Sequence, residues 1–248
     1  MVSRARPAGV RGRATSVVCR AVATVELDVA LGPDEDPLRV AANRLEPAIE
    51  AARAIGAPAV RWWVEATTER HREAARRAGL EAVRQLHQMR RPLPLEETTD
   101  LVTRPFRPGV DDDAWLTVNN RAFAWHPEQG GWTQETLQGR LAEPWFDPAG
   151  FLLHDVDDRL AGFCWTKVHA DEQPPLGEIY VIAVDPDFVG RGLGRALTVA
   201  GLDHLADRGL TVGMLYVEAD NAPAVGLYET LGFTIHHTTT AFEAVLAV

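Results

Sequence analysis

The chain has 248 residues, of which 46% are hydrophobic, with a mean hydropathy of -0.13 and a formal net charge of -10 at pH 7. These values are typical of a soluble globular protein with one large or two modest domains, and the acidic balance argues against nucleic acid as the main partner. No apolar run is long enough to cross a membrane, and no apolar segment follows the N-terminal arginines, so we expect a cytoplasmic protein. The two cysteines, Cys19 and Cys164, make neither a disulfide framework nor a metal site, so no metal is expected.

The first part of the chain predicts a basic arm followed by alternating strands and helices. Residues 1–21 carry five arginines among scattered Gly and Pro, which is typical of a poorly ordered arm. The run Arg91–Pro94 breaks regular structure, so we place a linker at about 91–99 and domains at 1–95 and 96–248. Between arm and linker, the hydrophobic pattern predicts a strand at Val25–Leu31, helical segments from Leu38 to Ile55 that are interrupted at Pro47 and stopped at Gly56, a strand at Ala59–Glu65, a helix at Thr68–Ala78 and a strand at Leu80–Met89.

The hydrophobic pattern of the second domain predicts an α/β fold: a strand and two helices come first, and strands and helices follow. Its elements are expected to be a short strand at Leu101–Phe106, a helix from Asp111–Asp113 through Phe123, a loop at His126–Gly131, a helix from Thr133 to about Ala142, a hairpin of Phe151–Val156 and Leu160–His169, a strand at Glu178–Val184, a helix from Leu193 to Gly209, a strand at Met214–Glu218, a helix from Asn221 to Leu231 and a strand at Thr234–Phe242.

A glycine-rich turn follows the strand at Glu178–Val184. Gly190, Gly192 and Gly194 stand at alternate positions, which lets the backbone curve around an anion without interference from Cβ atoms. A strand, a glycine loop and a helix N-terminus together present free backbone N–H groups to a phosphate. A structural turn would have the same composition, and the spacing fits neither the dinucleotide fingerprint nor the P-loop. The loop resembles the acetyl-CoA pyrophosphate loop of the GNAT acetyltransferases, with Val189 where Gln or Arg is usual.

Acetyl transfer from a thioester to an amine needs a base for the amine, a donor to the oxyanion and an acid for the leaving thiolate. Glu178 can serve as the base, directly or through water; the alternative is a carboxylate on a solvated strand face. Tyr228 follows Asn221 by two helical turns, so both can face one cleft, and an ordinary tyrosine pKa of about 10 suits a donor to a thiolate. The alternative for Tyr228 is an aromatic packing residue. A backbone N–H near Ile182–Val184 would be the oxyanion donor.

The chain also matches itself at an offset of 153 residues without gaps. Gly56 then coincides with Gly209 and Gly79 with Gly232, so the matches include predicted helix ends. The first domain is therefore predicted to be a partial, degenerate copy of the second that lacks about fifty opening residues. We expect either a truncated protein with an open sheet edge, which self-associates or is less stable, or a reading frame that begins further upstream. Opposite Gly190, Gly192, Gly194, Asn221, Tyr228 and Glu178 stand Pro37, Arg39, Ala41, Thr68, Ala75 and Val25. Only the C-terminal copy is therefore expected to be catalytic.

These features together resemble the mycothiol synthases, a family of tandem GNAT enzymes that acetylate the cysteine amine of Cys-GlcN-Ins in actinobacteria. The resemblance rests on the two copies, the loop His126–Trp132 (HPEQGGW), the stretch GEIYVIAVDP and the string from Asn221 to Phe233, and it is strongest from Asn119 to Phe242. It implies substrate contacts at Glu128, Lys167, Glu178 and Tyr216, with Tyr228 as the acid. It implies acetyl-CoA as co-substrate, bound by Ile182, Ala183, Val184, Val189, Gly190, Arg191, Gly192, Leu193, Gly194, Arg195, Asn221, Ala222, Pro223, Ala224, Val225 and Gly226.

The single lysine and the acidic composition also indicate the chemistry of the acceptor, independently of the family resemblance. Lys167 is the only lysine of the chain, which indicates either a chemical requirement or chance. An acidic cleft with one lysine suits a cationic, hydroxyl-rich acceptor. The alternatives are a GNAT enzyme that acts on protein N-termini or another small amine, and a CoA-binding regulatory module without turnover. We expect a small-molecule partner, no nucleic-acid or membrane partner, and a monomer.

Overall fold

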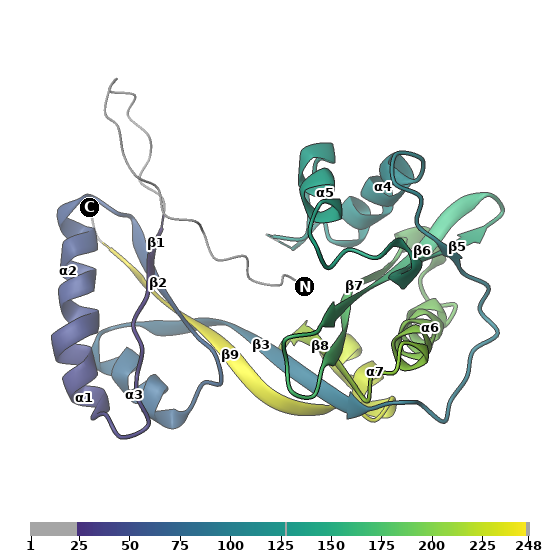
Figure 1. Ribbon diagram of the computed structural model, residues 1–248. Coiled ribbons are helices and arrows are strands. Elements are labelled where there is room, and N and C mark those ends of the chain that lie inside the picture. The colour runs from purple at the N-terminus through teal and green to yellow at the C-terminus, as the bar shows by residue number, and fades with distance from the viewer. Residues whose placement is uncertain (1–23, 127, 247–248) are drawn as a thin grey trace. The chain divides into compact units, whose positions relative to one another are not determined.

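The computed structural model describes residues 24–126 and 128–246, which form two compact units (Figure 1). The larger unit comprises Met89–Tyr216 and Pro223–Thr234, and the smaller unit comprises the remaining described residues. Strands β3 (Glu81–Pro92), β8 (Val212–Glu218) and β9 (Thr234–Val245) contribute residues to both units. Among the residues described, no helix is long and apolar enough to span a membrane. The predicted basic arm at 1–21 lies outside the described residues.

The larger unit is built on a mixed sheet. Its strands are β4 (Arg104–Pro105), β5 (Phe151–Val156), β6 (Arg159–His169), β7 (Leu176–Val184) and β8. Antiparallel pairing joins β4 to β5, β5 to β6 and β6 to β7, whereas β7 and β8 are parallel. The register of β6 against β7 shifts between Trp165 and Thr166, so Tyr180 is an additional residue on β7 at this β-bulge.

Helices cover both faces of this sheet (Figure 1). On one side lie α4 (Asp112–Ala122) and α5 (Gln134–Leu141), and on the other lie α6 (Leu193–Asp207) and α7 (Ala222–Thr230). Below α4 and α5, aromatic rings fill the core: Trp115 is fully buried and meets Trp132, Phe151, Phe163 and Trp165 edge-on. On the other face, a Cβ at Gly201 would lie 2.4 Å from Cys164 Sγ, so glycine allows α6 to pack directly on β6.

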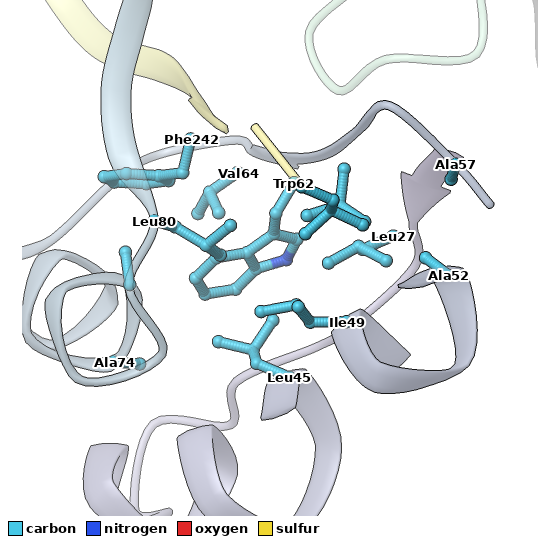
Figure 2. Close-up of a cluster of buried hydrophobic side chains, with 13 residues drawn as sticks. Leu27, Leu45, Ile49, Ala52, Ala57, Trp62, Val64, Ala74, Leu80 and Phe242 are labelled. Carbon is cyan, nitrogen blue, oxygen red and sulfur yellow. The ribbon is translucent and has the colours of Figure 1, made fainter. Parts of the chain in front are cut away.

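The smaller unit has its own hydrophobic core. Its elements are β1 (Val25–Leu27), α1 (Pro37–Val40), a π-helix η1 (Ala41–Leu45), α2 (Glu46–Ala54), β2 (Ala59–Val64), α3 (Glu69–Arg77) and parts of β3 and β9. β1 pairs with β2 in parallel, and β2 pairs with β9 antiparallel. Figure 2 shows Trp62 at the centre of the core, among Leu27, Leu45, Ile49, Leu80 and Phe242. Its indole N–H donates to the carbonyl of Val29 at 2.8 Å, so the buried ring keeps a hydrogen-bond partner.

The structure confirms the internal repeat. Shifted by 153 residues, β2 coincides with Val212–Val217 of β8, α3 coincides with α7, and β3 coincides with β9, residue for residue. The paired glycines also agree: φ is +72° at Gly56 and +82° at Gly209, and +73° at Gly79 and +80° at Gly232. Each is a left-handed residue that ends a helix. Two copies of one βα plan are therefore present, as predicted.

Several predicted boundaries were wrong, including the end of the last strand, which runs to Val245 instead of Phe242. The first strand ends at Leu27 instead of Leu31, because its pairing with β2 ends there. Pro47 does not interrupt the helix: it stands in the first turn of α2, after the wider turns of η1, where a missing N–H is tolerated. β3 continues past Met89 to Pro92, into the predicted linker. The strand expected at Leu101–Phe106 is reduced to β4, because only two of its residues pair with β5.

Candidate functional site

The glycine loop has the backbone geometry of an anion cradle. Gly190 and Gly192 have φ of +85° and +78°, in the left-handed region that favours glycine, and a Cβ at either would meet nothing within 4 Å. Gly192 immediately precedes Leu193, the first residue of α6. The first N–H groups of a helix have no preceding carbonyl to bind, so the loop presents unpaired donors at the positive end of α6.

A charged network holds the segment between β7 and this loop. The Arg121 guanidinium of α4 donates to Asp185 at 2.9 Å and to Asp187 at 3.0 Å, and Arg159 donates to Asp187 at 2.7 Å. Arg121 and Arg159 hold the pKa of Asp187 below its ordinary value. Phe188 is buried, with the guanidinium of Arg191 over its ring at 5.0 Å. The turn that leads into the loop is therefore held by side chains of α4 and β6 and by Arg191 of the loop itself.

Two side chains at the loop, Val189 and Arg195, differ in whether they are exposed or already hydrogen-bonded within the protein. Val189 is 67% exposed. Arg195, in the first turn of α6, donates from its guanidinium to both carboxylate oxygens of Glu97 at 2.6 and 2.7 Å and to Thr230 Oγ1 at 2.8 Å. The side chain of Arg195 is thus engaged within the unit.

Glu178 is fully buried on β7, so the alternative of a carboxylate on a solvated strand face was wrong. Its Oε2 lies 2.7 Å from His169 Nε2, and its Oε1 has no hydrogen-bond partner among the described residues. The neighbouring Ile179 reaches α6, since its Cδ1 lies 2.7 Å from a Cβ built at Gly201. Side chains alternate along a strand, so Glu178 lies on the opposite face, the side of α4 and α5.

Lys167 is the cross-strand neighbour of Glu178 in the β6–β7 ladder. Its Nζ lies over the ring of Trp145 at 4.6 Å and over that of Tyr180 at 5.6 Å. Burial lowers the pKa of Lys167, and the carboxylate of Glu178 acts in the opposite direction. An ammonium, a buried carboxylate and two aromatic faces therefore meet on one face of the sheet.

The strands β7 and β8 pair only over a short segment. The register joins Gly177–Ile179 to Gly213–Leu215, while β7 continues to Val184 and keeps its pairing with β6. The β7–β8 pairing therefore does not extend to Ile182–Val184, the segment where the oxyanion donor is expected. Tyr216, half-buried, stands two residues beyond Met214, the partner of Glu178, and so lies on the same face as Glu178.

Tyr228 lies in α7, on the α6 side of the sheet. Its side chain is 8% exposed, and its ring packs against Phe233 with centroids 5.8 Å apart. Burial raises the pKa of Tyr228, and the nearby Cys164, on the face of β6 that meets α6, adds to the shift. A raised pKa keeps the hydroxyl protonated, as a proton donor must be, but weakens it as an acid. The two predicted catalytic side chains therefore lie on opposite faces of the sheet (Figure 1).

Two other predicted segments lie at the start of α7 and on the loop after α4. Asn221 directly precedes α7, and its backbone N–H donates to the Glu218 carbonyl at 3.0 Å. Ala222 and Pro223 are exposed, whereas Ala224, Val225 and Gly226 are half-buried. Glu128, on the loop after α4, has an exposed side chain, while its N–H lies 3.2 Å from His126 Nδ1.

A buried amide pair shapes this loop. The Asn119 amide of α4 donates to the Gln129 carbonyl at 2.9 Å, and the Gln129 amide donates back to Asn119 at 2.9 Å. A Cβ at Gly130 would lie 2.2 Å from the Phe123 carbonyl oxygen, so only glycine fits there. These contacts explain Gln129 and Gly130 of HPEQGGW as residues that build the loop.

Sequence reasoning missed His169 and the cavity that it lines. An open cavity of about 750 Å³ adjoins the ends of β6 and α6. Its walls include Trp145, Asp147, Lys167, His169, Asp171 and Arg208. The only available signal was the position of His169, two residues after Lys167 and so on the same strand face. Among the described residues, no group of three or more metal-ligating side chains lies together.

Comparisons with known proteins agree with this geometry. The model of the "Acetyltransferase (GNAT) family" matches residues 115–233. A mycothiol acetyltransferase of Acidimicrobium ferrooxidans is 47% identical over 224 residues, which cover 86% of this chain and 72% of that protein. One of Thermomonospora curvata is 61% identical over 162 residues, which cover 63% of this chain and 54% of that protein. The chain thus spans between 54% and 72% of the length of these two relatives.

Two solved structures share the fold. A GCN5-related N-acetyltransferase from Sphaerobacter thermophilus has a TM-score of 0.62 at 23% identity, over 80% of this chain and 64% of that one. A tandem GNAT protein from the clavulanic acid biosynthesis pathway has a TM-score of 0.59 at 16% identity, over 87% of this chain and 73% of that one. The second of these structures is a tandem GNAT protein, so this chain also shares its fold with a protein that contains two GNAT copies.

Proposed function

This chain belongs to the mycothiol acetyltransferase family, within the GNAT enzymes, and we propose that it transfers the acetyl group of acetyl-CoA to the cysteine amine of Cys-GlcN-Ins. The observation that carries the proposal is the fully buried Glu178, with one carboxylate oxygen unpartnered, beside Lys167 and near the end of the β7–β8 pairing. We further propose that acetyl-CoA is the only cofactor and that the protein is a cytoplasmic monomer.

In this proposal the glycine loop and the start of α6 bind the pyrophosphate. Backbone N–H groups from Val189 to Arg195 supply the donors, and the left-handed Gly190 and Gly192 leave room for the phosphate oxygens. The acyl arm then runs along the open edge of Ile182–Val184, and the segment from Asn221 to Gly226 borders it at the start of α7. The thioester carbonyl lies where β7 and β8 diverge, so a β7 N–H stabilises the oxyanion.

The reaction needs proton transfers on opposite sides of the thioester. Glu178 Oε1 takes one proton from the acceptor ammonium, and the free amine attacks the acetyl carbonyl. The tetrahedral intermediate then collapses, the C–S bond breaks, and Tyr228 protonates the departing CoA thiolate. The nitrogen gives up its second proton, which returns through water to Tyr228, so the net reaction releases the one proton that Glu178 took up. Placing the base and the acid on different faces of the sheet lets each reach its own partner through the β7–β8 opening.

The acceptor binds on the face that holds Lys167 and Glu178. The adjoining cavity carries Asp147, Asp171 and Glu172, which attract an ammonium group, while Lys167 and the aromatic faces favour hydroxyl groups and an apolar sugar face. Glu128 and Tyr216 are proposed as further contacts. This chemistry fits an amine on a sugar–inositol carrier better than an anionic acceptor.

The test is to incubate the protein with acetyl-CoA and either Cys-GlcN-Ins, GlcN-Ins or an N-terminal peptide, and to measure free CoA and acetylated product by mass spectrometry. Acetyl-Cys-GlcN-Ins as the main product supports the proposal. Faster acetylation of the peptide would favour a protein N-terminal acetyltransferase. Acetyl-CoA binding without thioester cleavage would indicate a regulatory module.

Glu178→Gln isolates the role of the base. We expect turnover to fall by about 10²–10⁴, since that is the usual contribution of a general base, while acetyl-CoA affinity stays within a few-fold. Calorimetry with acetyl-CoA is the control, because the proposed cofactor contacts do not include the carboxylate. Loss of acetyl-CoA binding together with activity would show that Glu178 acts on the cofactor or on the fold instead.

A further inference from the structure

The contact between His169 and Glu178 has no part in the proposed reaction so far, although it is the closest polar contact of the proposed base. The two heavy atoms, His169 Nε2 and Glu178 Oε2, are 2.7 Å apart. Glu178 is fully buried, whereas the His169 side chain is 24% exposed and lines the 750 Å³ cavity. The imidazole therefore stands between the buried carboxylate and the open cavity.

We propose that His169 is a positioning residue for Glu178, an inference that rests on the proposed function of Glu178 as the base. A carboxylate accepts hydrogen bonds, so the neutral imidazole must carry its proton on Nε2 and donate it to Oε2. This bond fixes the carboxylate plane and occupies one oxygen. The acceptor amine is left with the other oxygen, Oε1, which has no partner among the described residues.

The same contact makes the base sensitive to the charge of the imidazole. A protonated His169 would place a second positive charge beside Glu178, in addition to the ammonium of Lys167 on the adjacent strand. Both charges stabilise the carboxylate and oppose its protonation by the acceptor. The neutral imidazole is therefore the form that positions Glu178 without adding a charge beside it.

Other charged groups share this environment and must be kept constant in a test. The cavity that His169 lines also contains Asp147, Lys167, Asp171, Glu172, His204 and Arg208. A comparison of wild type with a His169 variant at each pH cancels their contributions, because they are present in both proteins. His169→Gln suits this purpose: its amide can donate to Oε2 from nearly the place of Nε2, and it cannot be charged.

The experiment measures kcat with acetyl-CoA and Cys-GlcN-Ins from pH 5.5 to 8.5 for wild type, His169→Gln, His169→Leu and Glu178→Gln. We expect His169→Gln to stay within about threefold of wild type at pH 8, and the ratio of its kcat to that of wild type to rise as the pH falls. His169→Leu, which removes the donor, should lose up to about 100-fold at every pH, the size expected for a misplaced reacting group. Acetyl-CoA binding by calorimetry checks that each variant is folded.

Different results overturn different conclusions. If both His169 variants keep wild-type kcat and pH dependence while Glu178→Gln is inactive, His169 has no positioning role and the proposed function stands. If Glu178→Gln is fully active, the assigned base and the inference about His169 both fail. Histidine-selective ¹⁵N NMR gives a readout without turnover: a neutral His169 that carries its proton on Nδ1 cannot donate to Glu178, and this result would overturn the inference for any acceptor.

Discussion

Tyr228 and Tyr180 are both buried tyrosines whose pKa is raised by burial, to about 12 for Tyr180. They differ in position. Tyr180 lies in the aromatic core at the β7 bulge, where its ring meets Trp145 and Trp165 edge-on. Tyr228 lies in α7, where its ring packs against Phe233 and Cys164 is nearby. At the scale of single residues, the proposed acid is therefore distinguished by its neighbours and not by its burial.

A matched pair of substitutions tests this distinction. Tyr228→Phe keeps the ring packed on Phe233 and removes only the hydroxyl, so we expect kcat to fall with KM for both substrates little changed, as for an interaction made only in the transition state. Tyr180→Phe removes a hydroxyl of similar burial and should leave kcat within a few-fold. Steady-state kinetics of both variants provide the measurement. Equal kcat values for Tyr228→Phe and wild type would reduce Tyr228 to a packing residue.

The start of α4 shows how an element of the site is held in place. Asp111 accepts from the guanidinium of Arg107 at 2.9 Å and from that of Arg104 at 2.9 Å, and the Arg107 N–H also donates to it. The hydrogen bond from Arg107, then that from Arg104, lowers the pKa of Asp111 to about 2. The buried carboxylate thus anchors the helix that carries Arg121 and Asn119.

This anchor predicts a pH-dependent loss of stability. Because the pKa is depressed in the folded state, the stabilisation is complete above the unfolded pKa of about 4 and is lost as the pH falls toward 2. Asp111→Asn should cost roughly 2 kcal/mol in unfolding free energy at pH 7, and the difference from wild type should shrink between pH 4 and pH 2. Urea denaturation at several pH values measures it. Asp113→Asn, an exposed acid of the same helical turn, should change stability by less than about 0.5 kcal/mol.

The glycine loop is the second element on which the site depends. Gly192→Asp would place a Cβ and a negative charge in the proposed pyrophosphate cradle, so acetyl-CoA binding should be lost. Gly209→Asp is the matched control, because Gly209 has the same left-handed backbone, with φ of +82° and no atom within 4 Å of a Cβ, at the other end of α6. Calorimetry should detect acetyl-CoA binding only in the second variant. Loss of binding in both would attribute the effect to backbone strain and not to the cradle.

At the scale of the whole molecule, the two copies differ where a cofactor would bind. In the smaller unit the position of the glycine loop is occupied by the start of α1. A cavity of about 390 Å³ lies there, lined by the carboxylates of Asp34, Glu35 and Asp36 and by the guanidinium groups of Arg39 and Arg44. The two arginines face these carboxylates as ion-pair partners, and no alternate glycines open the backbone to a pyrophosphate.

We therefore predict one acetyl-CoA per chain. Titration calorimetry of the 248-residue protein should give a stoichiometry of one, and Arg39→Ala should leave both stoichiometry and affinity unchanged, because Arg39 belongs to the copy without a cradle. Gly192→Asp should abolish the single site. Two sites per chain, or equal loss of binding in Arg39→Ala and Gly192→Asp, would contradict the assignment of binding to the C-terminal copy.

The amino-acid sequence by itself determined the GNAT fold, the two-copy plan and the acetyltransferase family, all of which the structure and the comparisons confirm. These properties are carried by local signals: the alternate glycines, the helix-ending Gly56 and Gly209, and strand and helix periods that repeat after 153 residues. Each of these signals lies within a single turn, helix or strand, so it can be recognised in the sequence without knowledge of what packs against that element.

Only the tertiary structure decided how the candidate site is assembled. The contact of His169 with Glu178 depends on the β6–β7 register, and the face on which Glu178 lies depends on which strand residues meet α6. The end of the β7–β8 pairing before Ile182–Val184 depends on the register of these two strands. Burial of Glu178 and Tyr228 likewise comes from distant parts of the chain. Each of these properties arises from contacts between residues far apart in sequence, which local periodicity does not encode.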